Sequence, residues 1–234
     1  MIAVTFALPA ESSEFLRRLR DRTSAERNGV RIVRGKMDNR MIEVLHTGVG
    51  EEICRQRVGD FLQNQQFDLL ISTGFAGALN EELQIGDLLL AKNFSTIDLN
   101  ERRSSFSSLP IHEGKLLTVP ALIDSSEKRH EVARTSGAAA VDMETEFVAR
   151  ACAEHGIPLL SLRVISDTLE EPFPAPTNVL FDIEQQRTRF LMLATFFLAH
   201  PNRVPRLIQF ARRIARARKI LATALVTVVR SIEP

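Results

Sequence analysis

The chain has 234 residues, of which 44% are hydrophobic and 25% are charged, and its formal net charge is +1. This composition excludes a disordered or fibrous chain, and the length suits one sizeable domain. The near-neutral charge gives no overall attraction to nucleic acid or to membranes. The two cysteines lie far apart in the sequence, so we expect neither a disulfide framework nor a zinc site, and a reducing cytoplasm as the location.

Residues 2–8 form a short apolar run that predicts a buried strand. No basic segment precedes this run, which leads directly into Pro9, so we interpret it as a strand rather than a signal peptide. No apolar run reaches the roughly 20 residues that a membrane-spanning helix needs. Further apolar runs predict strands at residues 42–45, 68–72, 88–91 and 159–165. Apolar residues at helical spacing predict helices over residues 14–22, from residue 51 to about 64, and over 142–155.

The alternation of apolar strands with helices predicts an α/β fold. Its central sheet is expected to be largely parallel and covered on both faces. In such sheets ligands bind beyond the carboxyl ends of the strands. Three segments directly follow predicted strands, namely residues 9–11, 73–77 and 166–168. We therefore expect the functional site among these three loops.

Two carboxylates in these loops are candidates for chemistry. Glu11 follows the first strand and Asp167 follows the last one, and an acid at the carboxyl end of a strand is a stronger candidate than a random surface acid. Each also has a purely structural explanation, because Glu11 suits the first turn of a helix and Asp167 suits a helix N-cap. The small residues of segment 72–77 let backbone amides approach a ligand closely, although a tight turn also needs glycine.

The segment Asp142-Met143-Glu144 places two acids and a methionine at a predicted helix start. Acids are common in a first turn, but the methionine between them offers an apolar floor to a flat ligand. The five histidines lack metal-binding spacing, and no Walker, G-x-S-x-G or G-x-G-x-x-G motif occurs. We therefore expect no metal and no cofactor.

Five segments, in this order, resemble the nucleoside phosphorylase/nucleosidase superfamily, and in particular its methylthioadenosine/adenosylhomocysteine nucleosidase-like branch. They are residues 6–11, 47–50, 72–87, 140–144 and 163–167. The resemblance covers about residues 1–170 and implies a three-layer αβα sandwich with a mixed, mostly parallel central sheet. It also implies an enzyme that cleaves the N-glycosidic bond of a purine nucleoside-like substrate, with adenine as the base.

The resemblance further implies roles for the matching acids. Glu11 is expected to activate water, and Asp167, oriented by Ser166, to protonate or hydrogen-bond N7 of the purine. Glu144 is expected to bind the ribose hydroxyls, and Met143 to pack against the sugar.

Other positions of the resemblance imply further substrate contacts. Asp142 stands where glutamate is usual, and Leu122 stands where the family has an aromatic that stacks on the purine. Backbone atoms of Ile123, beside it, are expected to read the edge of the base. The remaining expected substrate contacts are Gly48, Phe75, Ala76 and Gly77.

The nucleophile is predicted to be water rather than phosphate. The family's Arg-x-Gly-Ser phosphate signature corresponds here to segment 72–75, where Ser72 replaces the arginine and Phe75 the serine. Losing a bidentate clamp disfavours phosphate, although an arginine from elsewhere could replace it, so a phosphorylase is the alternative. A non-catalytic binding protein is a third reading, disfavoured because Glu11, Glu144 and Asp167 occur together.

The C-terminal segment is basic and amphipathic. No acidic residue occurs between Gln185 and Ile232, whereas arginines recur and apolar residues follow helical spacing. We therefore divide the chain into a catalytic domain, residues 1–200, and a C-terminal helical extension, residues 201–234. Such a helix suits a membrane surface, a nucleic-acid arm, a docking partner, or a solvated helix packed on the domain.

This tail and the proline-rich segment 172–176 resemble the hopanoid-associated branch of the superfamily, which is linked to adenosylhopane. That resemblance implies a lipid-linked nucleoside and a peripheral membrane contact through residues 203–230. Nucleic acid is disfavoured as a partner because the chain has no Trp or Tyr to stack on bases. A homo-oligomer, such as a homodimer, is also expected from the resemblance.

Overall fold

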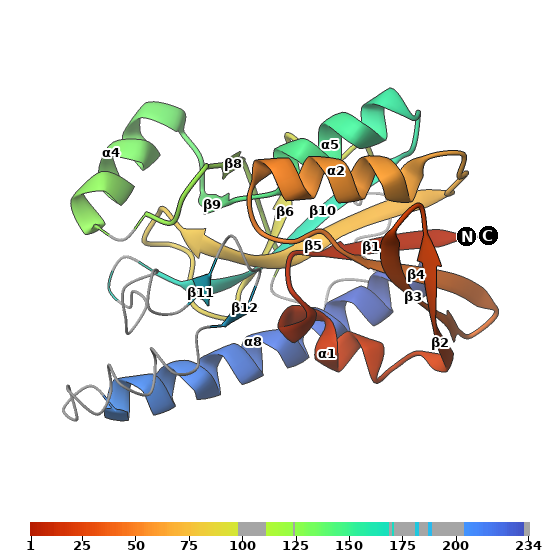
Figure 1. Cartoon of the computed structure of the whole chain (residues 1–234). Helices are drawn as coiled ribbons and strands as arrows, with labels where there is room; N and C mark the ends of the chain where they lie inside the picture. Colours follow the sequence, from red (N-terminus) through yellow and green to blue (C-terminus); the bar gives the residue numbers. More distant parts are fainter. Residues whose placement is uncertain are drawn as a thin grey trace.

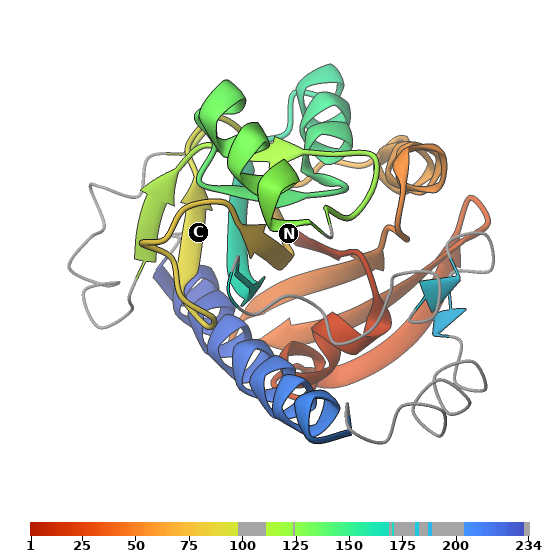
Figure 2. The same ribbon diagram turned by 90° about the vertical axis from the view of Figure 1, so that its left-hand side faces the viewer.

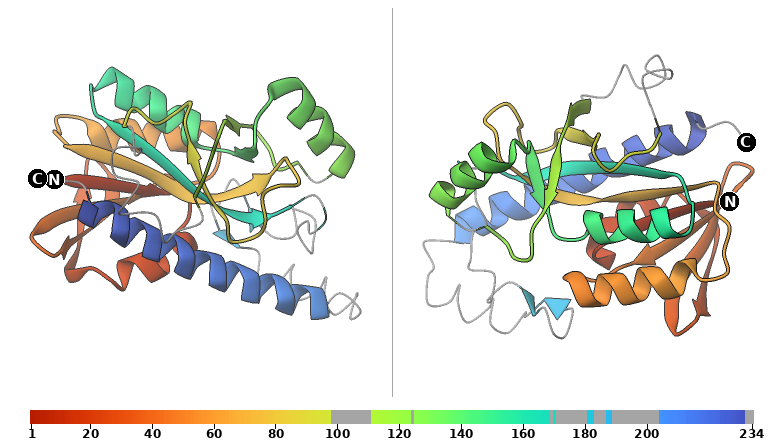
Figure 3. Two further views of the ribbon diagram at one scale, coloured as in Figure 1. Left: turned by 180° about the vertical axis from the view of Figure 1, so that it is seen from behind. Right: turned by 90° about the horizontal axis from the view of Figure 1, so that it is seen from above.

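A computed structural model describes most of the chain, in several stretches. These are residues 1–97, 111–123, 125–168, 170, 181–182, 187–188 and 204–231. Segment 172–176, expected to resemble a lid, lies outside the described residues. Within the described part, helices cover both faces of one mixed sheet, as predicted for a three-layer α/β fold (Figures 1 and 3).

The elements follow one another in an order that mixes strands and helices. The strands are β1 Ile2–Phe6, β2 Arg20–Arg27, β3 Val30–Met37, β4 Arg40–His46, β5 Leu69–Ala78, β6 Leu88–Ala91, β7 Ile111–Gly114, β8 Leu116–Thr118, β9 Ala140–Asp142, β10 Leu159–Asp167, β11 Phe181–Asp182 and β12 Arg187–Thr188. The helices are α1 Pro9–Leu16, α2 Glu51–Leu62, α4 Ser126–Ser136, α5 Thr145–Glu154 and α8 Val204–Ser231.

The centre of the sheet is parallel. Its strand order is β2-β3-β4-β1-β5-β10-β6-β7, with β9 paired to the end of β5 and β8 paired to β9. Strands β4, β1, β5 and β10 run in the same direction, whereas β2 and β3 are antiparallel to their neighbours, and β6 is antiparallel to β10. The carboxyl ends of the four parallel strands therefore meet at one edge, onto which Figure 2 looks.

Two apolar cores lie on opposite faces of the sheet because successive strand residues point to opposite sides. In β1, Ile2, Val4 and Phe6 pack in the core that contains α1 and α8. Ala3, between them, packs in the core that contains α2 and α5. The apolar residues of β5 and β10 alternate between the two cores in the same way, which explains why most residues of these strands are apolar although polar side chains interrupt both sequences.

The C-terminal half of α8 is part of the first core. Seven of its residues are buried there, namely Ala217, Leu221, Ala222, Ala224, Leu225, Val228 and Val229. The N-terminal half is more exposed and extends along the lower side of the molecule in Figure 1. Residues 217–229 thus belong to the same packed unit as β1 and β10, although the predicted division at residue 200 assigned them to an extension.

The predicted helix over residues 14–22 is wrong. The helix starts earlier, at Pro9, which suits a first helical position, and ends at Leu16. From Arg20 the chain forms β2, an edge strand of mostly exposed residues that no apolar alternation signals. Leu19 is buried against β3, where a Cβ on Gly35 would lie 2.9 Å from the Leu19 Cβ, so tertiary packing turns the chain here.

Two other predicted boundaries are corrected. The predicted loop 73–77 belongs to β5, because this strand continues past the end of β1 and pairs with β10 and β9 instead. The predicted helix start at residue 142 is a strand, β9, and α5 begins at Thr145. The Asp142 carboxylate accepts a hydrogen bond from the Thr145 backbone amide at 3.1 Å. It therefore binds the first amide of α5, although Asp142 itself lies outside the helix.

Replacing Leu225 by alanine tests whether α8 is integral to the fold. Leu225 is fully buried, so Leu225→Ala is expected to lower the free energy of unfolding by about 3 kcal/mol. Ile208, on the same helix but 47% exposed, is the matched control. Ile208→Ala is expected to change the free energy of unfolding by less than about 1 kcal/mol. Urea denaturation measures both, and equal small losses would contradict the core role of α8.

Candidate active site

The predicted site residues gather at the edge where the parallel strands end. Glu11 lies in the first turn of α1, which follows β1, and Gly48 is the second residue after β4. The Gly48 amide donates to Ala7 O at 3.0 Å, and its φ of 80° is one that glycine adopts without strain. Ser166 and Asp167 end β10.

Glu11 is a buried carboxyl, 7% exposed. Its Oε2 accepts hydrogen bonds from the backbone amides of Ala7 at 3.0 Å and Leu8 at 3.2 Å, which ties it to the end of β1. A Cβ on Gly74 would lie 3.1 Å from the same oxygen, so only glycine fits there without a shift. Burial raises the pKa of Glu11 to about 7, and these hydrogen bonds and the charge of Arg163 only partly oppose it.

Glu144 lies near Glu11, at the N-cap of α5. Burial, followed by the negative charges of Asp142 and Glu11, raises its pKa well above the ordinary value. Its Oε1 has no contact with solvent and no hydrogen-bond partner among the described residues. The Thr73 hydroxyl on β5 is likewise buried and without a hydrogen-bond partner among the described residues. Buried polar atoms normally have partners, so both atoms are available to hydrogen-bond a polar ligand.

A small cavity joins these groups. Its volume of about 10 Å³ is the space of one water molecule. Its polar lining includes Thr47, Ser72, Thr73, Glu11, Glu144 and Arg163. A buried carboxyl with a pKa near neutrality, facing a space for one water, has the arrangement of a general base.

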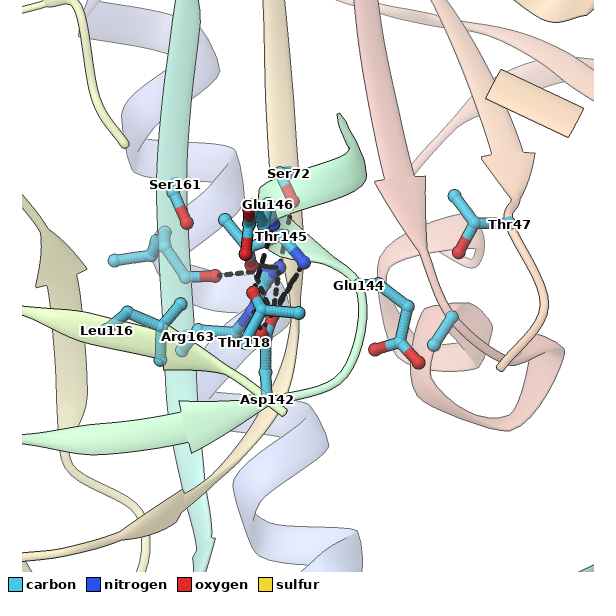
Figure 4. Close-up of polar contacts among 12 residues, drawn as sticks. Thr47, Ser72, Leu116, Thr118, Asp142, Glu144, Thr145, Glu146, Ser161 and Arg163 are labelled. Carbon is cyan, nitrogen blue, oxygen red and sulfur yellow. Dashed lines mark hydrogen bonds and ion pairs between the residues drawn. The ribbon is translucent and has the colours of Figure 1, made fainter. Parts of the chain in front are cut away.

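A buried ion pair lies beside this cavity. Arg163 on β10 donates from Nε to Asp142 Oδ2 at 3.1 Å, and its Nη2 donates to Ser72 Oγ at 2.8 Å and to the Thr145 hydroxyl. Asp142 Oδ1 accepts from the Thr118 hydroxyl at 2.8 Å. Figure 4 shows this cluster gathered on one side, with Glu144 and Thr47 apart from it.

Asp167, the last residue of β10, pairs with Gly77 of β5, and its carboxyl is also buried. Ser166 Oγ donates to its Oδ1 at 2.7 Å, and a Cβ on Gly77 would lie 3.0 Å from its Oδ2. The same Oδ2 forms an ion pair with Arg129 of α4. Arg129 Nε donates to the backbone oxygen of Ile123 at 2.9 Å. Arg129 therefore joins two of the positions predicted to contact the base.

The structure thus brings the predicted residues into two neighbouring groups. Glu11 and Glu144 form one, and Ser166, Asp167, Gly77 and Ile123 form the other. Of the remaining predicted contacts, Ala76 is buried in β5, whereas Phe75 and Met143 are half-buried. Asp142 has both oxygens engaged by protein groups and does not line the cavity.

Sequence reasoning missed Arg163 and Arg129. Arg163 interrupts an otherwise apolar strand, which is a signal that the sequence contains, because a buried charge needs a partner. Arg129 carries no such signal, because α4 is polar apart from Val132 and Ala133, and only the fold shows which of its arginines is buried.

A larger cavity, of about 390 Å³, lies elsewhere. It is lined by residues 80–81 and 83–86, by Thr168 and Glu170, and by Arg213, Arg216 and Ala217 of α8. None of the predicted site residues lines it, so its size does not make it the active site. Among the described residues no cluster of His, Cys, Asp or Glu could hold a metal ion, and none of the helices has the length and apolar character needed to cross a membrane.

Comparison with known protein families shows to which superfamily the chain belongs. The family model of the Phosphorylase superfamily matches residues 1–107 and 98–199. The chain belongs to this superfamily. Among curated relatives, a 5'-methylthioadenosine/S-adenosylhomocysteine nucleosidase from Exiguobacterium is 22% identical, with 77% of this chain and 89% of the relative covered.

Solved structures of the superfamily show the same fold. The nucleosidase of that name from Campylobacter jejuni superposes with a TM-score of 0.74 at 20% identity, and 99% of each chain is covered. A futalosine hydrolase mutant from Helicobacter pylori superposes with a TM-score of 0.73 at 18% identity, again over 99% of each chain. The three-layer fold predicted for this chain is therefore confirmed.

The raised pKa of Glu11 has a consequence for stability. Between pH 4.5 and about 7 the folded state keeps a proton that the unfolded chain has lost, so stability falls as pH rises through this range. Glu11→Gln removes this titration. The stability of the variant relative to wild type is expected to rise by up to about 3 kcal/mol between pH 4.5 and pH 8. Denaturant titrations at both pH values measure it, and a difference independent of pH would contradict the raised pKa.

Proposed function

We propose that this protein hydrolyses the N-glycosidic bond of a purine nucleoside-like substrate and releases the free base. The observation that carries the proposal is the pairing of Glu11 with a cavity the size of one water, beside the free oxygens of Glu144 and Thr73. The relatives are named as nucleosidases, which agrees with this reaction. Adenine is the base expected from the sequence.

In this mechanism Glu11 acts on the attacking water. Its carboxylate takes a proton while the water oxygen bonds to the anomeric carbon, and the bond to the purine nitrogen breaks with its electrons passing to the base. Glu144 binds the ribose hydroxyls through the free Oε1, and Met143 packs on the sugar. Asp167, oriented by Ser166, acts at N7 of the purine, which departs beside Gly77 and Ile123.

Water is favoured over phosphate by the state of Arg163. It is the arginine that lines the cavity, but its Nε and Nη2 donors are taken by Asp142, Ser72 and Thr145. A guanidinium engaged in this way lacks the free bidentate fork that binds phosphate. We assign Arg163 a positioning role, and Asp142 the role of holding Arg163.

Replacing Glu11 tests the proposed base. Glu11→Gln is expected to lower kcat for base release by about 10²- to 10⁴-fold with little change in KM. In wild type, kcat/KM is expected to fall about tenfold per pH unit below pH 7, because protonated Glu11 cannot accept a proton. Glu14→Gln, on the same helix but ion-paired with Arg17 outside the cavity, is the control.

The choice of nucleophile is tested in the same assay. Base release is expected at the full rate without phosphate, and the sugar product is expected to carry one oxygen from ¹⁸O-labelled water. A rate proportional to phosphate, with a sugar phosphate as product, would show a phosphorylase instead.

We also propose a peripheral membrane contact through the basic N-terminal half of α8, within residues 203–230. Arg212, Arg216 and Ile208 are exposed there, and Lys219, just past the middle of the helix, is exposed as well. Basic residues beside an anionic surface contribute about 1 kcal/mol each, and an exposed apolar side chain can enter the headgroup region. The expected cytoplasmic location and homo-oligomer remain predictions.

Vesicle co-sedimentation tests this contact without truncating α8, whose C-terminal half is core. Arg212→Gln combined with Lys219→Gln is expected to weaken binding to anionic vesicles by about 10-fold or more. The control removes two exposed arginines from β2 and β3, with Arg20→Gln and Arg31→Gln. Equal recovery of wild type and both variants would remove the basis for the proposal.

A further inference from the structure

A serine and a histidine outside the small cavity are hydrogen-bonded to each other, and each is next in sequence to a residue that lines it. Ser12 follows Glu11 in α1 and is fully buried, and His46 is the last residue of β4, before Thr47. Ser12 Oγ lies 2.8 Å from His46 Nε2. Glu11 and Thr47 line the cavity, whereas Ser12 and His46 do not. The pair therefore joins the two chain segments that carry these lining residues.

The direction of this hydrogen bond follows from the other partner of Ser12. The Ser12 hydroxyl donates to Pro9 O at 3.1 Å, three residues earlier in the chain. A hydroxyl has a single proton, so His46 Nε2 carries the hydrogen and donates it to Ser12 Oγ. Burial, followed by the positive charge of Arg57, lowers the pKa of His46 to about 4. His46 is therefore a neutral donor at the pH range in which Glu11 titrates.

The first turn of α1 lies between the ends of two strands. In the sheet β1 is placed between β4 and β5, and α1 begins two residues after β1. On the β5 side, Gly74 lies so close that a Cβ on it would be 3.1 Å from Glu11 Oε2. On the β4 side, His46 holds Ser12. Contacts on both sides thus determine where the carboxyl of Glu11 lies in the cavity.

We propose that Ser12 and His46 are positioning residues, whose hydrogen bond fixes the first turn of α1 against β4 and keeps the cavity at the size of one water. The inference rests on the proposed function, because Glu11 is the base in that reaction. Neither residue contacts the attacking water, and both act through their neighbours, Glu11 and Thr47. Such positioning matters because a displacement of about 1 Å in a catalytic group can cost about 10²-fold in rate.

Loss of this hydrogen bond is expected to change the titration of Glu11. Without it the first turn of α1 can move away from β4, and more water can enter the cavity. Burial is the main cause of the raised pKa of Glu11, so hydration lowers this pKa. The charged groups around Glu11 are Arg163 of β10 and Glu144 at the start of α5, and α8 places Arg218 against Ala10 O at 3.2 Å. None of them is altered by removing the Ser12 hydroxyl.

Ser12→Ala tests this role through the pH profile of base release. It is expected to lower kcat about 10-fold with little change in KM, because Glu11 is no longer held at the attacking water. The acid limb of kcat/KM is expected to move about 0.5 to 1 pH unit lower, because more Glu11 is ionised at each pH. The loss relative to wild type is therefore smaller at about pH 5 than at about pH 8.

Ser13→Ala is the matched control. The Ser13 hydroxyl makes the same kind of bond, to Ala10 O at 3.1 Å, but among the described residues it bonds only within α1. This variant is expected to keep the kcat and the pH profile of wild type. A Ser12→Ala profile equal to that of Ser13→Ala, or a fall in kcat with an unmoved acid limb, overturns the inference and leaves the proposed function intact.

Substitutions of His46 decide the matter if Ser12→Ala does not fold. Glutamine places its amide nitrogen near the position of the histidine Nε2, whereas asparagine is one methylene shorter. His46→Gln is therefore expected to keep the wild-type profile, and His46→Asn to show the lower kcat and shifted acid limb expected for Ser12→Ala. Equal profiles for the two variants contradict the positioning role. Release of no base by wild type overturns the proposed function and this inference together.

Discussion

Arg163 and Asp142 form a buried ion pair at the point where β10, β9 and α5 meet. Two charges without water need partners for their remaining hydrogen-bonding groups, and here Ser72, Thr145 and Thr118 supply them. The pair therefore ties β5, β8, β9, β10 and α5 together around one small volume. Glu144, two residues after Asp142, owes its position beside Glu11 to this arrangement, because the end of β9 determines where the N-cap of α5 lies.

The cavity next to this pair combines features that oppose stability and favour chemistry. Glu11 and Glu144 are both carboxyls in a poorly solvated site, and the charge of Glu11 adds to the raised pKa of Glu144. If stability alone mattered, apolar side chains, or one acid instead of two, would make the folded state more stable here. Arg163 supplies positive charge nearby, but its donors are committed to Asp142, Ser72 and Thr145. A base with a pKa near neutrality is the consequence.

Strand β5 links the two ends of the site. Gly74 lies against the carboxyl of Glu11. Gly77 lies against the carboxyl of Asp167 and the guanidinium of Arg129. Three residues of extended chain span about 10 Å, which separates the water end from the base end by roughly the size of a nucleoside. Glycine at both positions lets the backbone approach side chains that any Cβ would crowd. The spacing of these two glycines therefore determines how far apart the chemical groups stand.

The sequence by itself determined the parallel core strands, the order of the segments and the acids at the strand ends, because these depend on apolar runs and local spacing. It misjudged residues 14–22, where packing of Leu19 against Gly35 overrides the helical pattern, and it placed Asp142 in a helix that begins at Thr145. Only the tertiary structure decided that Asp142 holds Arg163 and that Arg129 meets Asp167. Both pairs join residues more than twenty positions apart, and their strength comes from burial, a property that the fold creates and no local pattern encodes.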